Sequence, residues 1–505
     1  MKKKKGTVRL ILAALLAAAL ILPAVSYAQE TEAFTVNPSD HPMTAEEVRA
    51  MTEDAREAFY QNSGLRDELA SEIETMSEVL PTLNYPSEER EFFILTHDGK
   101  SMRFFMEIIG EPDENGRYPL YITLHGGGGG PEEGNNDEWI TMSYYYKGAV
   151  GSGIYVACRG ITDTWDLHFR EDSYPLYDRL IEAMIVLHGA DPDRVYLLGF
   201  SAGGDGVYQV SPRLADRFAA VNMSSGHPNG VSLLNLANCP ICLQAGVRDW
   251  YDEDAMRSIR AAEFEETLSG FREKYGFGYE HRIFIHVPAG HNYVDNEDTD
   301  ALVLSSPALF AERAVGMDAL GVFLEVMEEC GLKRDVSELS YYPCEDSEVF
   351  DIGITEAVTD TLGLETVTEN TNAVGYVSQF TRDPAPARLV WDLSTRARTR
   401  EKNSFYWLEA DPSVDRGIIT AEYDASANTI TVEKDAEVNG DFAILFNPSL
   451  VDVSRPVTIR TGDIEIIVRV NPSEEFLRDS IIENGDPALG CVGKIMYSDI
   501  VSSGK

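Results

Sequence analysis

The chain has 505 residues, a length that fits about three domains, and its 44% hydrophobic and 25% charged content is that of an ordinary soluble globular protein. This composition argues against a collagen-like chain, a mostly disordered chain and a multi-span membrane protein. Its 42 basic and 84 acidic residues give a formal net charge of −42. We expect no nucleic-acid partner, because so acidic a chain gains little from counterion release.

Residues 1–28 are predicted to be a secretory signal peptide. Four lysines precede the apolar run 10–22, Pro23 ends that run, and Ser26 and Ala28 place small residues where a signal peptidase reads. The alternative is an uncleaved anchor, but about 13 apolar residues are too few for a helix that spans a bilayer. We therefore expect cleavage after Ala28, a secreted protein (extracellular or periplasmic), and no membrane partner after cleavage.

Residues 29–89 are predicted to form a helical region on the surface. Thr44 and Glu47 have the spacing of a helix capping box, and Pro81 and Pro86 end the helical pattern.

Residues 90–332 alternate short β-rich runs with longer helical ones. Their central apolar runs predict an α/β fold, an α/β-hydrolase-like mostly parallel sheet with helices on both faces, whose site lies at the carboxyl ends of the strands. The predicted strands are 91–96, 102–108, 120–124, 154–157, 195–199, 219–223, 241–245 and 282–287, and the predicted helices are 138–149, 174–188, 202–210, 254–274 and 308–329.

An acidic linker is predicted over 333–372 and an all-β sandwich-like module over 373–505. The alternating runs at 429–432, 442–446, 456–460 and 464–470 carry the second prediction.

Six cysteines suit an exported protein with disulfides. Cys330 and Cys344 are the best candidate pair. Cys239 and Cys242 have redox-motif spacing, but they begin an apolar run rather than a helix, so strand-end packing is the favoured interpretation.

The strongest chemical signal is Gly199-Phe200-Ser201-Ala202-Gly203. An apolar strand precedes it and a helix-compatible stretch follows, which is the context of a strained turn that lifts a nucleophilic serine above a sheet. The alternative is a chance match to a common pattern.

A glycine run, 126–130, follows His125 at another strand end. Glycines let backbone N–H groups approach a developing oxyanion closely. We expect Ala202 and either Gly127 or Gly128 to donate these N–H groups. A flexible turn is the plain alternative, and a phosphate-binding loop lacks its Lys and Ser/Thr here.

A serine nucleophile needs a base and a carboxylate that orients it. His291 follows the last core run and Asp249 follows the penultimate one, so that Ser201, Asp249 and His291 occur in the order that such folds use. His227, at another strand end, is the reserve candidate for the base, and it is also a candidate for substrate binding.

Together these motifs resemble secreted α/β-hydrolase esterases of the polyhydroxybutyrate-depolymerase and feruloyl-esterase-like group, with prolyl-oligopeptidase-type catalytic domains as relatives. The resemblance covers about 90–330 and implies a catalytic triad of Ser201, Asp249 and His291. It is specific for the superfamily and weak for the substrate.

Two further groups have open roles. Trp165 and His168 follow the predicted strand 154–157 and are candidates for the substrate pocket wall, with a packed loop as the equal alternative. The acidic run 295–298 lacks the spacing of a calcium loop, so a solvated surface is expected.

The sequence therefore predicts a secreted serine hydrolase that cleaves small-molecule or polymer-derived carboxylic esters without metal or cofactor. The alternatives are a serine peptidase of prolyl-oligopeptidase type and a non-catalytic polymer-binding surface protein. The last would use aromatic residues that look exposed, although a sandwich core uses the same residues: Tyr376, Phe380, Trp391, Phe405, Tyr406 and Trp407.

Overall fold

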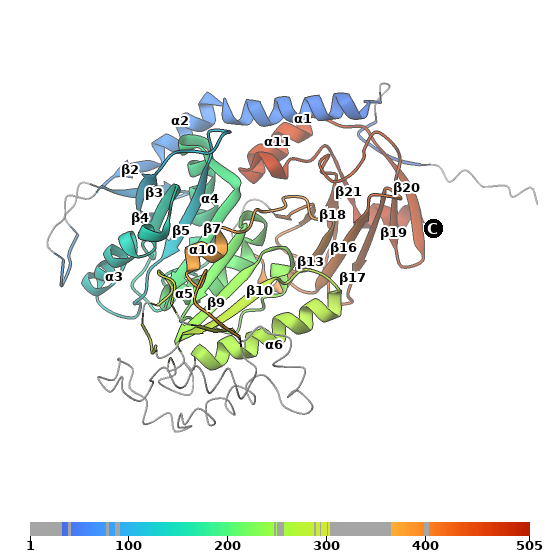
Figure 1. Ribbon diagram of the computed structural model, residues 1–505. Helices are drawn as coiled ribbons and strands as arrows, with labels where there is room; N and C mark the ends of the chain where they lie inside the picture. Colours follow the sequence, from blue (N-terminus) through green and yellow to red (C-terminus); the bar gives the residue numbers. More distant parts are fainter. Residues whose placement is uncertain are drawn as a thin grey trace, which may run out of the picture.

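The computed structural model describes residues 33–38, 42–76, 80–85, 91–246, 249, 257–286, 289–292, 294–299, 301–303, 365–397 and 403–504 (Figure 1). The signal peptide, the helix predicted at 308–329, most of the predicted linker and the pair Cys330 and Cys344 lie outside these residues.

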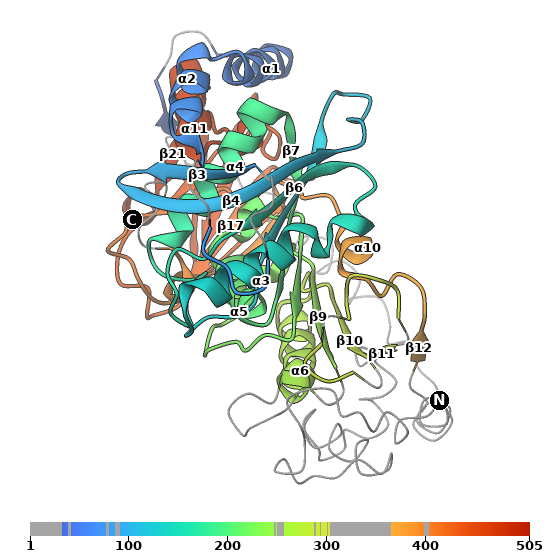
Figure 2. The same cartoon turned by 90° about the vertical axis from the view of Figure 1, so that its left-hand side faces the viewer.

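The predicted α/β fold is present in the described chain as an 11-stranded sheet in the order β12-β11-β10-β9-β8-β7-β5-β6-β4-β3-β2. The strands from β5 to β10 pair in parallel and the outer strands pair antiparallel. Figure 2 shows the twisted sheet from β3 and β4 to β11 and β12. Its strands are β2 (Ile73–Thr75), β3 (Phe92–His97), β4 (Lys100–Ile109), β5 (Tyr118–Leu124), β6 (Gly153–Cys158), β7 (Ala190–Phe200), β8 (Ala220–Ser224), β9 (Ile241–Gly246), β10 (His281–His286), β11 (Ala301–Val303) and β12 (Glu365–Val367).

Helices cover both faces of this sheet because the central strands are apolar on both. On β7, Val195 and Leu197 belong to one core cluster, whereas Tyr196 and Leu198 belong to the other. The first cluster includes α4 (Ser173–His188), α5 (Ala202–Val210) and α6 (Arg257–Tyr275), and the second includes α3 (Glu132–Tyr145) and α10 (Ala373–Val377). Strand alternation thus sorts the side chains between two layers.

The N-terminal region contacts both the large sheet and the C-terminal region. Its elements are β1 (Phe34–Val36), α1 (Ala45–Tyr60) and α2 (Ser63–Ser71). The capping box of Thr44 and Glu47 is confirmed at the start of α1, but the strands β1 and β2 were not predicted. β1 pairs in parallel with β20 of the C-terminal region, and β2 pairs with β3 of the large sheet.

The C-terminal region forms two further sheets, in the orders β1-β20-β19-β17-β16-β13 and β14-β15-β18-β21. The four predicted strand runs are present as β17, β18, β19 and β20, whereas the helix α11 was not predicted. The elements are β13 (Arg388–Asp392), β14 (Ser404–Phe405), β15 (Leu408–Ala410), β16 (Ile418–Asp424), β17 (Thr429–Lys434), β18 (Phe442–Leu445), β19 (Val457–Thr461), β20 (Ile464–Val470), α11 (Glu474–Asn484), β21 (Lys494–Met496) and α12 (Tyr497–Ser503).

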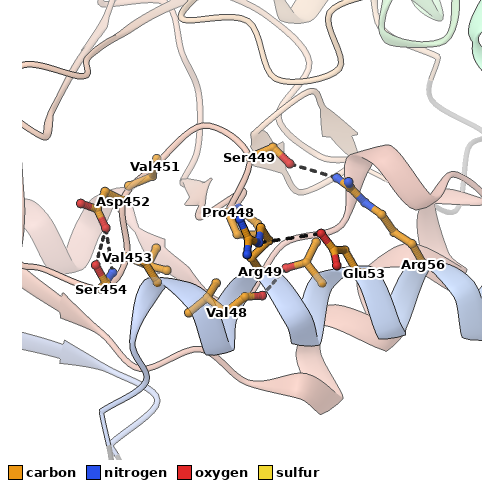
Figure 3. Close-up of a pocket in the computed structure, with 12 residues that line it drawn as sticks. Val48, Arg49, Glu53, Arg56, Pro448, Ser449, Val451, Asp452, Val453 and Ser454 are labelled. Atoms are coloured by element: carbon orange, nitrogen blue, oxygen red, sulfur yellow. Dashed lines mark hydrogen bonds and ion pairs between the residues drawn. The ribbon is translucent and has the colours of Figure 1, made fainter.

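Helix α1 lies along this C-terminal region (Figure 1). Arg56 Nη2 donates to Ser449 Oγ at 2.9 Å, and Arg49 pairs with Glu53 at 3.9 Å on the same helix (Figure 3). The pocket in this view is lined by α1 and residues 448–449 and 451–454, and it contains none of the residues predicted to carry chemistry.

The aromatic residues that looked exposed are packed instead. Trp391, Phe405, Tyr406 and Trp407 are buried in the core cluster that the C-terminal sheets share with α4 to α6, and Tyr376 is buried on α10. Only Phe380 of the six is partly exposed. The six residues therefore do not form an exposed aromatic surface: four of the rings pack in the core that includes the C-terminal sheets, and Tyr376 and Phe380 pack in the core cluster on the other face of the large sheet.

A buried ion network ties the C-terminal region to the large sheet. The Asp486 carboxylate lies 3.0 Å from Arg217 Nη1 and 2.8 Å from Arg382 Nη1. Arg217 also contacts Asp178 of α4, and Arg382 contacts Asp193 of β7. Burial would raise the pKa of Asp486, but the guanidinium groups of Arg382 and Arg217 hold it below its usual range.

Within the described ranges, Cys239 and Cys242 are buried and unpaired, and burial raises the pKa of both thiols, as strand-end packing requires. No helix in the described part of the chain is long and apolar enough to cross a bilayer.

Candidate active site

The predicted turn at Ser201 is present where β7 passes into α5. Ser201 has φ 56° and ψ −120°, a conformation that a residue with a side chain rarely adopts. The flanking glycines have no space for a side chain: a Cβ atom would lie 2.2 Å from Gly203 O if built on Gly199, and 2.0 Å from Leu124 O if built on Gly203. The strain is therefore maintained by close packing around the turn.

The structure brings Ser201, His291 and Asp249 together in one row of hydrogen bonds. His291 Nε2 lies 2.9 Å from Ser201 Oγ, and His291 Nδ1 lies 2.9 Å from Asp249 Oδ1. The Asp249 side chain is fully buried and that of His291 is 8% exposed. Because an ionised carboxylate only accepts, Nδ1 carries the proton and Nε2 is left to accept from the serine hydroxyl.

The sheet delivers these groups from the ends of β7, β9 and β10, with β8 between β7 and β9. Asp249 follows β9 and His291 follows β10, two strands that pair in register. A Cβ atom on Gly246 would lie 2.2 Å from Gly290 O, so this glycine lets the loop that carries His291 close over the end of β9.

Sequence reasoning missed Arg257, which supports Asp249. The Arg257 backbone N–H donates to Asp249 O at 2.9 Å, and its Nη1 lies 3.8 Å from Asp249 Oδ1. Arg257 begins α6, and the sequence contains no spacing signal that connects it with Asp249.

Asp295, four residues after His291, fixes the loop that carries His291 through hydrogen bonds to its carboxylate. Its carboxylate accepts from Tyr145 Oη at 2.8 Å, Tyr146 Oη at 2.7 Å and Asn222 Nδ2 at 3.1 Å. Asp295 is fully buried, and burial raises its pKa. The expectation that residues 295–298 form a solvated surface is therefore wrong for Asp295. Within the described residues, no group of three His, Cys, Asp or Glu side chains is placed to hold a metal ion.

The glycine run lies beside Ser201, as predicted, but its N–H groups differ in their partners. The Gly128 N–H donates to Asn135 Oδ1 at 2.7 Å, so it is turned away from Ser201. Of the two predicted alternatives, this bond leaves Gly127 as the donor from the glycine run. Among the described residues, the Gly127 N–H has no acceptor, and Ala202 begins α5, where an N–H has no acceptor in its own helix.

Asn135 connects the glycine run to a buried polar cluster. Its Nδ2 donates to Asp163 Oδ1 at 2.9 Å, and Asp163 pairs with Arg159, which is 1% exposed. Asn135 comes from α3, so this helix holds the loop in place. The spacing of seven residues between Gly128 and Asn135 gave no signal of this contact.

His168 is not a wall of the pocket. It is fully buried beneath the glycine run, where its ring lies 2.9 Å from His125 O and 3.2 Å from Tyr177 Oη. Burial lowers the pKa of His168 to about 3, so the ring is neutral at ordinary pH. The prediction that His168 contacts substrate is wrong because its fully buried ring is bonded to His125 O and to Tyr177 of α4.

The substrate-binding roles of Trp165 and His227 stay predictions. Trp165 is 54% exposed and lies against Gly128. The His227 N–H donates to Asp205 Oδ1 at 2.6 Å, and its ring is half-buried beside Asn229. The imidazole at Ser201 is that of His291, so His227 is not needed as the reserve base.

Comparison with known proteins gives fold-level neighbours only. No protein-family model matches the sequence, and no curated protein matches it. The chain is similar to solved structures of Est1E from Butyrivibrio proteoclasticus (13% identity, 40% of this chain and 90% of that chain, TM-score 0.28). It is also similar to LpqC, a poly(3-hydroxybutyrate) depolymerase from Bordetella parapertussis (17% identity, 40% and 85%, TM-score 0.33).

Proposed function

We propose that this chain is a serine hydrolase that cleaves carboxylic esters through an acyl-enzyme intermediate on Ser201. The observation that carries the proposal is the row of hydrogen bonds from Ser201 Oγ through His291 to the buried Asp249, formed at a serine with positive φ. The Gly127 and Ala202 N–H groups beside it supply the donors that a developing oxyanion requires.

The proposed reaction has two halves. His291 Nε2 takes the hydroxyl proton as Ser201 Oγ bonds to the ester carbonyl carbon, and the carbonyl oxygen becomes the oxyanion. The bond to the alcohol oxygen then breaks, and the alcohol leaves with the proton from His291. In the second half, a water gives its proton to His291 and attacks the acyl group. The bond to Ser201 breaks, the acid leaves, and Ser201 regains its proton.

Asp249 keeps the imidazole in the required tautomer. It accepts from Nδ1–H and stabilises the imidazolium that forms in each half of the reaction. Arg257 in turn holds the backbone and the carboxylate of Asp249.

The test is turnover of p-nitrophenyl butyrate by the purified protein and its Ser201→Ala variant. We expect the variant to lose on the order of 10⁴-fold or more in kcat, because the nucleophile itself is removed, with an unchanged circular-dichroism spectrum. A fluorophosphonate probe should label the wild type and leave the variant unlabelled.

Ser101→Ala is the matched control, because Ser101 is exposed on β4 and its hydroxyl contacts only Thr96 among the described residues. It should keep full turnover and labelling. Ester turnover that persists in Ser201→Ala would contradict the proposal.

We also propose that the protein is exported and cleaved after Ala28. The basic start, the short apolar run and the small residues before the cut support this step. Mass spectrometry of the exported protein should find an N-terminus at Gln29, and an intact Met1 start in the exported fraction would contradict it.

A further inference from the structure

Helix α3 places a carboxylate beside the nucleophile. A Cβ atom built on Gly126 would lie 3.3 Å from Glu138 Oε2 and 3.4 Å from Ser201 Cβ, so both atoms are close to one point in space. A Cβ atom on Gly127 would lie 3.3 Å from Glu138 Cγ. Glu138 is half-buried and lies one helical turn after Asn135, the residue that holds the glycine run.

An aromatic side chain lies on the next part of the same glycine run. A Cβ atom on Gly128 would lie 3.0 Å from Trp165 Cα, and one on Gly129 would lie 3.8 Å from Trp165 Cβ. Trp165 is 54% exposed, one of the few large apolar side chains in the described residues with more than a third of its surface accessible. Glu138 and Trp165 thus border the loop that is proposed to bind the oxyanion.

We propose that Glu138 and Trp165 form a subsite for a positively charged group, so that the preferred substrates are esters with a cationic group next to the scissile carbonyl. The inference rests on the proposed ester hydrolysis at Ser201. A carboxylate at this position repels an anionic substituent and attracts a cationic one, and an indole ring is the best aromatic partner for an ammonium group. The net charge of −42 also favours the approach of cations.

The experiment compares esters of equal shape that differ in one charge. On the alcohol side, the pair is acetylthiocholine and 3,3-dimethylbutyl thioacetate. On the acyl side, the pair is the ethyl esters of betaine and of 3,3-dimethylbutyric acid. Each kcat/KM ratio is divided by the ratio of the alkaline hydrolysis rates of the same two esters, because the cationic ester is intrinsically more reactive. We expect this corrected ratio to be about tenfold in favour of the cation for at least one pair, as a half-buried charge pair near the reacting atoms would give.

The variants identify the side chains responsible. Glu138→Gln should bring this ratio close to one, because kcat/KM for the cationic ester falls relative to that for the neutral ester. Trp165→Leu should lower the ratio by about threefold, the size of an exposed cation–π contact. Glu114→Gln is the matched control, because it makes the same charge change far from the glycine run. Glu114 lies on the exposed turn before β5, whereas the glycine run follows the other end of that strand.

The outcomes separate this inference from the proposed function. Neutral esters hydrolysed with no preference for the cation in either pair would overturn the subsite and leave the function standing. A ratio that survives in Glu138→Gln, or one that falls equally in Glu114→Gln, would also overturn it. Absence of any ester turnover in the wild type would remove the proposed function itself.

Discussion

The polar groups around Ser201 and those around Asp486 use the same kinds of side chain in different ways. At Ser201 the groups line up at strand ends, and the Gly127 N–H is left without an acceptor among the described residues. At Asp486 two guanidinium groups meet one carboxylate, and all three side chains are at most 1% exposed. The first arrangement keeps unused hydrogen-bonding capacity for a substrate, whereas the second uses its charges to join two regions of the fold.

This difference predicts opposite phenotypes. Substitution in the Ser201 row should cost turnover and leave folding intact, as tested above with Ser201→Ala. Substitution in the ion network should cost folding and leave the chemistry intact.

Asp486→Ala should give the largest loss of stability in the ion network. It leaves Arg217 and Arg382 buried without their shared carboxylate, which typically costs about 3–5 kcal/mol of unfolding free energy. Chemical denaturation followed by circular dichroism measures this loss. At a temperature where the variant is folded, its kcat/KM for p-nitrophenyl butyrate should equal that of the wild type.

Asp452→Ala is the control for that variant. Asp452 pairs with Arg455 at the surface, where both side chains are more than a third exposed, so its loss should cost at most about 1 kcal/mol. Equal destabilisation by the two substitutions would contradict the assigned role of the buried network.

A second prediction concerns the pH dependence of stability, and it rests on the buried side chain of His286. His286 on β10 bonds to Gln244 Oε1 and Thr299 Oγ1, each at 2.7 Å, and burial lowers its pKa from 6.5 to about 4. Below pH 6.5 the unfolded chain gains a proton at this residue before the folded chain does. The folded state therefore loses stability as the pH falls toward 4, by about 3 kcal/mol from this group.

The measurement compares the unfolding free energy of the wild type and His286→Gln at about pH 7 and at pH 4. The variant has no such group, so the advantage of the wild type should shrink by about 3 kcal/mol at the lower pH. Parallel stability curves for the two proteins over this range would refute the linkage.

The local parts of this molecule were predictable from the sequence. The strand, turn and helix around Ser201 follow from two glycines at fixed spacing and from an apolar run, and chain order alone placed Asp249 and His291 at neighbouring strand ends. Short apolar runs that alternate with longer helical segments predicted the parallel sheet, because this pattern depends only on near neighbours in the chain.

The non-local parts were not predictable. Arg257, Asp295 and Asn135 act through contacts that the sequence spacing does not encode, and the three charges at Asp486 come from segments more than 100 residues apart. The errors at the site have the same origin. The direction of the Gly128 N–H and the burial of His168 depend on how separate loops pack, which a single sequence does not reveal.

The smallest predicted effect tests how rigid the glycine run must be. Asn135→Ala removes the acceptor of the Gly128 N–H, so the loop loses the contact that turns it. Because small displacements of an oxyanion donor weaken its hydrogen bond in the transition state, kcat should fall by about tenfold with KM nearly unchanged. Asn136→Ala is the control: its side chain bonds to Pro81 O and Arg159 Nε rather than to the glycine run. An equal loss of kcat in both variants would show that α3 acts on turnover only through stability, and the Ser201 region would then resemble the Asp486 network more closely than the geometry indicates.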